Sequence, residues 1–201
     1  MPSIYQLKPA FQGLLRPLVH TLAKAGVTAN QVTVLAAGLS VLLGLGLAIW
    51  PMCRLLWLLL PLLLFIRMAL NAIDGMLARE HNMKSPLGAF LNELGDVVSD
   101  AALYLPIALL PGASSWLAVL AVIAAILTEF TGVVALQAGA SRRYDGPLGK
   151  SDRAFVYGAM GLALGLGLMP GEWISVVLAL VLLLSLVTVL NRLRQALSVR
   201  S

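Results

Sequence analysis

The chain has 201 residues, of which 60% are hydrophobic and only 11% are charged. Soluble domains are typically about half apolar and a quarter charged, so this composition excludes an ordinary soluble domain and predicts an integral membrane protein. The formal net charge of +5 does not indicate nucleic-acid binding, because the basic residues are spread among the connections. The single cysteine, Cys53, excludes an internal disulfide framework and a cysteine-based metal site.

The first 26 residues predict an amphipathic helix that lies along the inner membrane surface. From Ile4 to Ala25, apolar residues recur at helical spacing and alternate with polar and basic ones, so this segment is too polar to cross a bilayer. The sequence Val-Thr-Ala-Asn at residues 27–30 predicts a turn and a helix cap before the first span. No cleavage site accompanies the first apolar run, so we expect that run to be retained.

Long uncharged runs then predict six transmembrane helices within residues 31–192. A helix needs about 20 mostly apolar residues to cross the hydrocarbon. The long uncharged runs are residues 33–51, 55–66, 101–128, 154–171 and 173–191. We therefore predict an all-α integral membrane fold, a single domain over residues 1–201, with six transmembrane helices preceded by the interfacial helix.

The basic residues are distributed unevenly among the connections. One set of connections and both termini carry Lys8, Arg16, Lys24, Arg79, Lys84, Arg142, Arg143, Lys150, Arg153, Arg192, Arg194 and Arg200. The opposite connections carry only Arg54. By the positive-inside rule, this asymmetry places both termini in the cytoplasm, which requires an even number of spans.

Polar side chains gather in the second and third predicted spans. Arg67, Asn71 and Asp74 share one face of the second, because they are separated by four and three residues. A charged side chain at the centre of a membrane helix costs about 2.5–3.5 kcal/mol on insertion scales. Each charged residue in these spans therefore needs a structural or functional explanation. Arg67, and Glu129 in the fourth span, could be structural partners that tie helices together.

The third span carries a similar stripe at intervals of four, formed by Asn92, Asp96 and Asp100. Acids outnumber bases in this region, and close carboxylates raise one another's pKa unless a cation neutralises them. Oxygen donors without His or Cys favour magnesium, manganese or calcium over zinc or copper. The stripes therefore predict a site for a hard divalent cation.

The run from Asn71 to Asp96 resembles the signature of the CDP-alcohol phosphatidyltransferases, D-x2-D-G-x2-A-R-x8-G-x3-D-x3-D, with every interval kept. Six residues match its fixed positions: Asp74, Gly75, Ala78, Arg79, Gly88 and Asp96. Asn71 and Asn92 stand where the first and third Asp belong, which resembles a subgroup of the family. A carboxamide keeps a neutral oxygen ligand but loses the charge.

The resemblance implies roles for these residues. In the family the four Asp hold two divalent ions, and the last Asp is the general base. The implied metal ligands are Asn71, Asp74, Asn92 and Asp96, and Asp100, on the same face, could compensate for a lost carboxylate. Asp96 is the implied catalytic base, and the implied cofactor is one or two Mg²⁺ or Mn²⁺ ions.

The resemblance also implies a nucleotide site. The implied nucleotide-binding residues are Asp74, Gly75, Ala78, Arg79, Gly88, Asn30 and Thr33. Small residues allow a nucleotide to lie against the helices, and an arginine offers a planar fork of donors to phosphate. The alternative for Gly75 and Gly88 is close helix packing through small residues.

The implied reaction transfers a phosphoalcohol group, such as phosphatidyl, from a CDP-alcohol such as CDP-diacylglycerol to an alcohol or phosphoalcohol acceptor, with release of CMP. We expect Lys150 and Arg153, and then Arg142 and Arg143, to contact a phosphate on the acceptor. Ordinary positive-inside topology is the alternative explanation for these cations. Membrane lipids, a homodimer and a bacterial inner membrane are implied in the same way.

Two other functions stay open. Because half of the motif carboxylates are replaced, the protein could bind a CDP-lipid or nucleotide without turnover. A cation-coupled transporter would also place acids in membrane helices, but it predicts inverted repeats with polar positions in both halves. Here the acids gather in the second and third spans.

Overall fold

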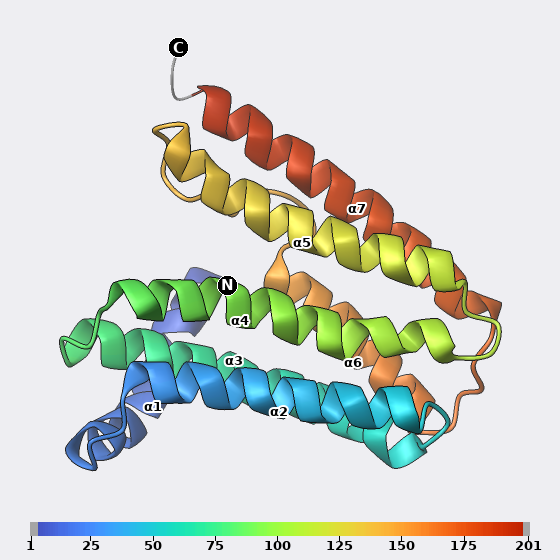
Figure 1. Ribbon diagram of the computed structural model, residues 1–201, viewed down its shortest axis with the longest axis horizontal. Coiled ribbons are helices and arrows are strands. Elements are labelled where there is room, and N and C mark those ends of the chain that lie inside the picture. The colour runs from blue at the N-terminus through green and yellow to red at the C-terminus, as the bar shows by residue number, and fades with distance from the viewer. Residues whose placement is uncertain (1–3, 199–201) are drawn as a thin grey trace. The chain divides into compact units, whose positions relative to one another are not determined.

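The structure, a computed structural model, describes residues 4–198, and side chains from residue 10 onward. The described residues form helices and no strand, which confirms the predicted all-α class (Figure 1). The elements are α1 (Ile4–Lys24), α2 (Ala29–Ile49), α3 (Arg54–Glu80), α4 (Pro86–Tyr104), the 3₁₀ helix η1 (Leu105–Leu109), α5 (Ser115–Gln137), α6 (Lys150–Gly165) and α7 (Glu172–Leu197).

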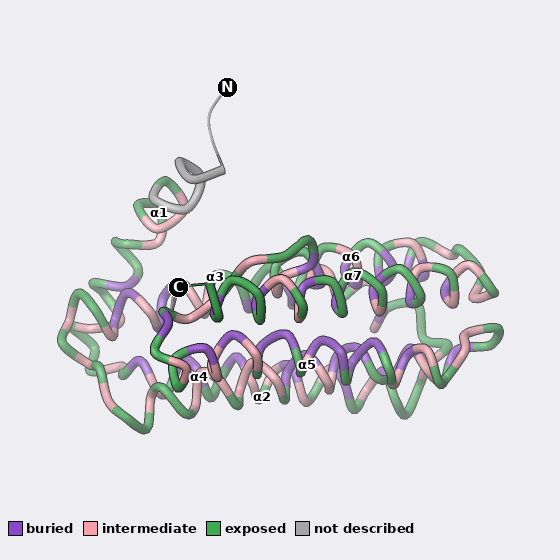
Figure 2. The backbone as a smooth tube through the Cα atoms, turned by 90° about the horizontal axis from the view of Figure 1, so that it is seen from above, coloured by how far each residue is buried: buried purple, intermediate pink, exposed green. Residues whose placement is uncertain are grey.

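Four of these helices, α2, α3, α5 and α7, are long and apolar enough to cross a membrane. Large apolar side chains on them are exposed, for example Leu42, Phe65 and Leu183, as expected for surfaces that face lipid. Exposed and buried positions alternate along the helices (Figure 2). Helix α4 carries three acids within 19 residues, and α6 has only 16 residues, roughly 24 Å at 1.5 Å per residue. The six-span arrangement and the interfacial position of α1 stay predictions.

The connection between α1 and α2 has the capping geometry that its sequence indicates. Gly26 adopts a φ of 78°, and the Val27 N–H donates to the Leu22 carbonyl at 3.0 Å, which ends α1 in a Schellman motif. Thr28 and Gln31 then form a reciprocal capping box, with side chain to backbone distances of 2.9 and 3.3 Å. The predicted turn and cap are thus confirmed.

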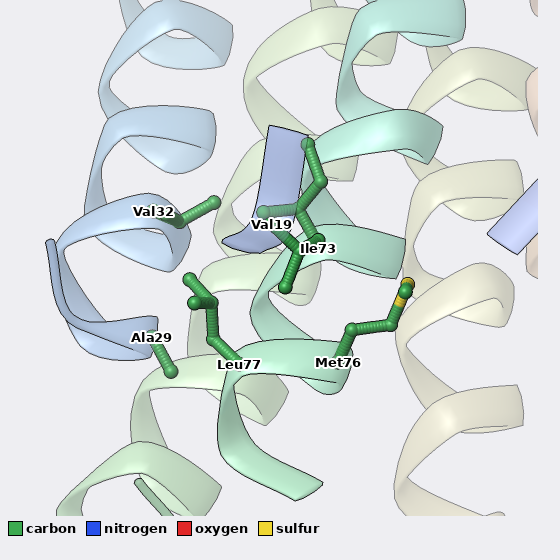
Figure 3. Packing of buried hydrophobic residues seen from close by; sticks show 6 residues of the cluster. All are labelled: Val19, Ala29, Val32, Ile73, Met76 and Leu77. Atoms are coloured by element: carbon green, nitrogen blue, oxygen red, sulfur yellow. The ribbon is translucent and has the colours of Figure 1, made fainter. Parts of the chain in front are cut away.

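The chain divides into two compact units. The first comprises the described residues up to 39 together with 63–99, and the second comprises 40–62 and the described residues from 100 onward. The first unit has an apolar core in which α1, α2 and α3 meet (Figure 3). This core consists of Val19, Ala29, Val32, Ile73, Met76 and Leu77.

In the second unit, α5 and α7 pack side by side (Figure 1). Alanines such as Ala118, Ala121 and Ala125 line the buried face of α5, and small residues let helices approach closely (Figure 2).

The turn between α2 and α3 exposes Cys53, whose N–H donates to the Trp50 carbonyl at 3.0 Å.

Candidate functional site

The first unit contains a cavity of about 650 Å³ between α2, α3 and α4. It is lined by every predicted nucleotide-binding residue and by both motif asparagines, namely Asn30, Thr33, Asn71, Asp74, Gly75, Ala78, Arg79, Gly88 and Asn92. Residues 83–85 of the α3–α4 connection, with Pro86, Ala89 and Glu93 of α4, complete the wall. The spacing of the motif did not indicate Lys84 or Ser85, because both lie in its variable segment.

Local structure explains how the short α3–α4 connection brings the two motif halves together. Asn82 has a φ of 55°, a left-handed conformation that asparagine tolerates well, and it reverses the chain after α3. Ser85 then caps α4 by accepting a hydrogen bond from the Gly88 N–H at 3.0 Å. Pro86 occupies the first helical position, where no N–H is needed.

Asp74 is a buried carboxylate in the cavity wall. The Thr33 hydroxyl of α2 lies 2.8 Å from Asp74 Oδ2 and 3.1 Å from the Ala29 carbonyl of its own helix, so its single proton is shared between these two acceptors. This contact orients the carboxylate of α3 from the neighbouring helix. Thr33 of α2 thus contacts Asp74 of α3 directly, and its nucleotide-binding role stays a prediction.

Asp96 is held from α3 by two donors. Arg67 Nη2 donates to Asp96 Oδ1 at 3.3 Å and to the Asp96 backbone carbonyl at 3.1 Å. Asn71 Nδ2 donates to the same Oδ1 at 3.3 Å. Among the described residues, Asp96 is not one that lines the cavity. Its hydrogen-bond partner Asn71 does line the cavity, so Asp96 lies directly behind the cavity wall.

The donor chemistry is that of a site for a hard divalent cation. Among the described residues, no group of three or more His, Cys, Asp and Glu could hold a metal ion. Asp74 and Asp96 provide carboxylate oxygens, while Asn71 and Asn92 can provide only neutral ones. Oxygen donors of this kind suit Mg²⁺ or Mn²⁺, which commonly completes its coordination with water and substrate phosphate.

The predicted acceptor residues belong to the second unit, together with Asp100. Glu129 Oε1 accepts a hydrogen bond from Arg153 Nη2 at 2.8 Å, and Arg192 Nη1 lies 3.7 Å from the same oxygen. Arg142 Nη2 lies 3.7 Å from Glu129 Oε2. Arg153 also contacts Asp100 at 3.4 Å. We name these five residues the Glu129 cluster.

The Glu129 cluster is largely enclosed. The side chain of Arg153 is 0% exposed and that of Arg192 is 2% exposed, and both donate to Thr128, Arg153 to its hydroxyl and Arg192 to its carbonyl. Arg143 pairs with Asp145 at 2.7 Å, and Lys150, half-buried, begins α6. The burial of Arg192 was missed, because its position after the last apolar run is typical of an exposed cytoplasmic residue.

Together, these features define an integral membrane protein of helices that encloses a carboxylate and carboxamide pocket. The sequence profile of the CDP-alcohol phosphatidyltransferases matches residues 26–190, so the chain belongs to this family of phospholipid-biosynthesis transferases, which depend on divalent metals. The chain is 49% identical over 195 residues to the inner membrane protein YnbA of Escherichia coli, covering 97% of this chain and 96% of that protein.

Further relatives support the family and the fold. A phosphatidylinositol phosphate synthase of Corynebacterium glutamicum is 34% identical over 116 residues, which are 58% of this chain and 48% of that protein. Crystal structures of the Mycobacterium tuberculosis phosphatidylinositol phosphate synthase share the fold. The form with CDP-DAG bound has a TM-score of 0.71 at 19% identity, covering 90% of this chain and 92% of that chain. The form with manganese and citrate has a TM-score of 0.71 at 20% identity, covering 90% and 87%.

Gly88 lines the cavity, and we predict that Gly88→Ala weakens nucleotide binding. A Cβ there would lie 2.7 Å from Asn30 Oδ1 and 3.1 Å from Ser85 Oγ, so the methyl group must displace the cavity wall. Overpacking of this kind costs about 1–3 kcal/mol, so affinity for CDP should fall roughly tenfold by calorimetric titration. Gly13→Ala is the control, because a Cβ added there would meet no described atom within 4 Å outside the backbone of its own helix. Equal affinity in both variants would contradict a nucleotide site at Gly88.

Proposed function

We propose that this protein transfers a phosphoalcohol group, such as phosphatidyl, from a CDP-alcohol such as CDP-diacylglycerol to an alcohol or phosphoalcohol acceptor. The acceptor oxygen bonds to the phosphorus next to the lipid or alcohol group of the donor. The bond from that phosphorus to the CMP phosphate breaks, and CMP leaves. One observation carries the proposal: every signature residue that the resemblance assigns to nucleotide binding lines the same cavity. These residues are Asp74, Gly75, Ala78, Arg79 and Gly88.

Within this proposal, the motif residues divide the work. Gly75, Ala78 and Gly88 leave room for the nucleotide, and Arg79 contacts a phosphate with its planar fork of donors. Asp96 accepts the proton of the acceptor hydroxyl, a role that requires its carboxylate to be ionised and within hydrogen-bond reach.

Asp74 and Asp96, with Asn71 and Asn92, are the residues that would hold a divalent cation, and we keep Asp100 as a further proposed ligand. When bound, such a cation supplies positive charge to the diphosphate and to the departing CMP.

For the acceptor, we propose that Lys150, Arg153, Arg142 and Arg143 favour an anionic group. Their support is the concentration of cations within 12 residues of the chain. We further propose a homodimer in a bacterial inner membrane with both termini in the cytoplasm. The asymmetry of Lys and Arg supports this orientation, and the relationship to an Escherichia coli inner membrane protein supports the location.

CMP release by the purified protein tests the proposed function. We expect incubation with CDP-diacylglycerol, Mg²⁺ or Mn²⁺ and a panel of alcohols and phosphoalcohols to yield equal amounts of CMP and a new phosphodiester lipid, measured by mass spectrometry. Chelation of the metal with EDTA should abolish both products, and added Mn²⁺ should restore them. The panel identifies the acceptor at the same time.

A specific observation favours a second candidate, a nucleotide-lipid binding protein without turnover. Two motif positions carry Asn, and Asp96 is engaged by Arg67 and Asn71. If the protein binds CDP-diacylglycerol but releases no CMP with any acceptor, this second candidate is correct. If it neither binds the CDP-alcohol nor releases CMP, both functions are rejected.

A further inference from the structure

Arg67 is a buried cation that lies beside Asp96, the proposed catalytic base. The family signature does not contain this arginine. Only 4% of its side chain is exposed, against 16% for Asp96. It lies one helical turn before Asn71 on α3, so the guanidinium reaches the same stripe as the motif residues. A buried arginine is costly unless a carboxylate pairs with it, and the contact with Asp96 provides that pairing.

Two donors from α3 meet at one oxygen of Asp96. Asp96 Oδ1 receives N–H donors from Arg67 and Asn71, both at 3.3 Å. An oxygen that accepts two such donors already has its negative charge partly compensated. The same oxygen is a poor ligand for a further cation, because the donor hydrogens occupy the directions from which a metal would approach.

The charges of the site lead to the same conclusion. Among the site residues of the first unit, Asp74 and Asp96 contribute two negative charges, and Arg67 contributes one positive charge. Arg79, Lys84 and Glu93 in the cavity wall add one further net positive charge. One divalent ion leaves a modest positive charge that a diphosphate can neutralise, whereas two ions would leave a larger positive charge that a diphosphate does not balance.

We propose that Arg67 is an internal counter-cation of Asp96, which limits this site to one divalent ion per chain and holds Asp96 in position. Arg67 is thus a positioning residue, and it acts through Asp96. The inference deepens the proposed function and rests on it only for the presence of a metal. Its test counts bound ions without turnover, so failure of CMP release and failure of this inference are distinguishable.

Manganese titration of the purified protein in an uncharged detergent tests the inference. The electron paramagnetic resonance signal of free Mn²⁺ measures how many ions each chain binds. We expect one ion per wild-type chain. Arg67→Gln keeps an N–H donor but removes the positive charge, so it should bind Mn²⁺ roughly tenfold more tightly, because the repulsion between the two cations is lost. Arg67→Lys keeps the charge and should retain the wild-type affinity.

Arg54→Gln is the matched control, because Arg54 is exposed at the start of the same helix and its loss should leave Mn²⁺ affinity unchanged. A purely structural role for Arg67 predicts the opposite change, a weaker site in Arg67→Gln. Two ions bound to the wild-type chain would overturn the inference. This measurement uses only the wild-type protein, so it does not depend on whether Arg67→Gln can be purified in folded form. An unchanged or lower affinity in folded Arg67→Gln would overturn it as well.

Discussion

Replacement of Asp96 by asparagine should lower the rate of CMP release at least about a hundredfold, the lower end of the usual contribution of a positioned general base. The carboxamide has nearly the same size but cannot accept the proton of the acceptor hydroxyl. It also offers a neutral oxygen in place of a charged one to a divalent ion. The rate is measured with CDP-diacylglycerol and the best acceptor from the panel, at saturating Mn²⁺.

The Asp96 variant leaves the Arg67 guanidinium without its carboxylate, so its folding must be checked separately. A melting curve and CDP affinity show whether the fold and the cavity are retained. Asp152→Asn is the control, because Asp152 is an exposed acid that caps α6 by accepting from the Gly149 N–H, and asparagine can accept that bond too. CMP release at the wild-type rate by a folded Asp96→Asn variant would disprove the role of Asp96 as the base.

The second large effect is expected for stability at Glu129. Glu129→Gln removes the negative charge that Arg153, Arg192 and Arg142 share. Arg153 keeps its contact with Asp100, but the cluster loses its central carboxylate, and removing one partner of a buried ion pair costs up to about 3–5 kcal/mol. We expect a clearly lower melting temperature for the purified protein, followed by tryptophan fluorescence, and reduced recovery of folded protein from membranes.

Glu172→Gln makes the same chemical change at an exposed position in the first turn of α7, so it controls for loss of one acid. Its melting temperature should stay close to that of the wild type. If Glu129→Gln melts at the wild-type temperature, the Glu129 cluster does not stabilise the second unit. The arginines would then owe their positions to other contacts, such as those with Thr128 and Asp100.

Helical spacing and the family signature together indicated several of the residues that line the cavity. Residues three and four apart share a face of a helix, so the sequence alone places Asn71, Asp74 and Ala78 on one side of α3. The fixed intervals of the signature then join this face to Gly88 and Asn92 of α4. All five residues line the cavity.

Partners on different helices could not be predicted in this way. The pairing of Arg67 with Asp96, and that of Arg192 with Glu129, depends on how helices pack, and spacing within one helix carries no information about it. Uncharged runs were also an incomplete guide to spans. The five runs, together with the even number that the charge asymmetry requires, indicated six spans, whereas four of the described helices are long and apolar enough to cross a membrane. Helix α4 carries three acids and α6 has only 16 residues, so the six-span arrangement stays a prediction.

The exposed turn that contains Cys53 has a consequence for any pairing of two chains. Because the sequence contains one cysteine, oxidation cannot form a disulfide within one chain. A disulfide between two identical copies must therefore join Cys53 to its own counterpart. Such a bond requires the two Cα atoms to lie within about 7 Å of each other, so an oxidised pair would report that these turns meet across a twofold axis.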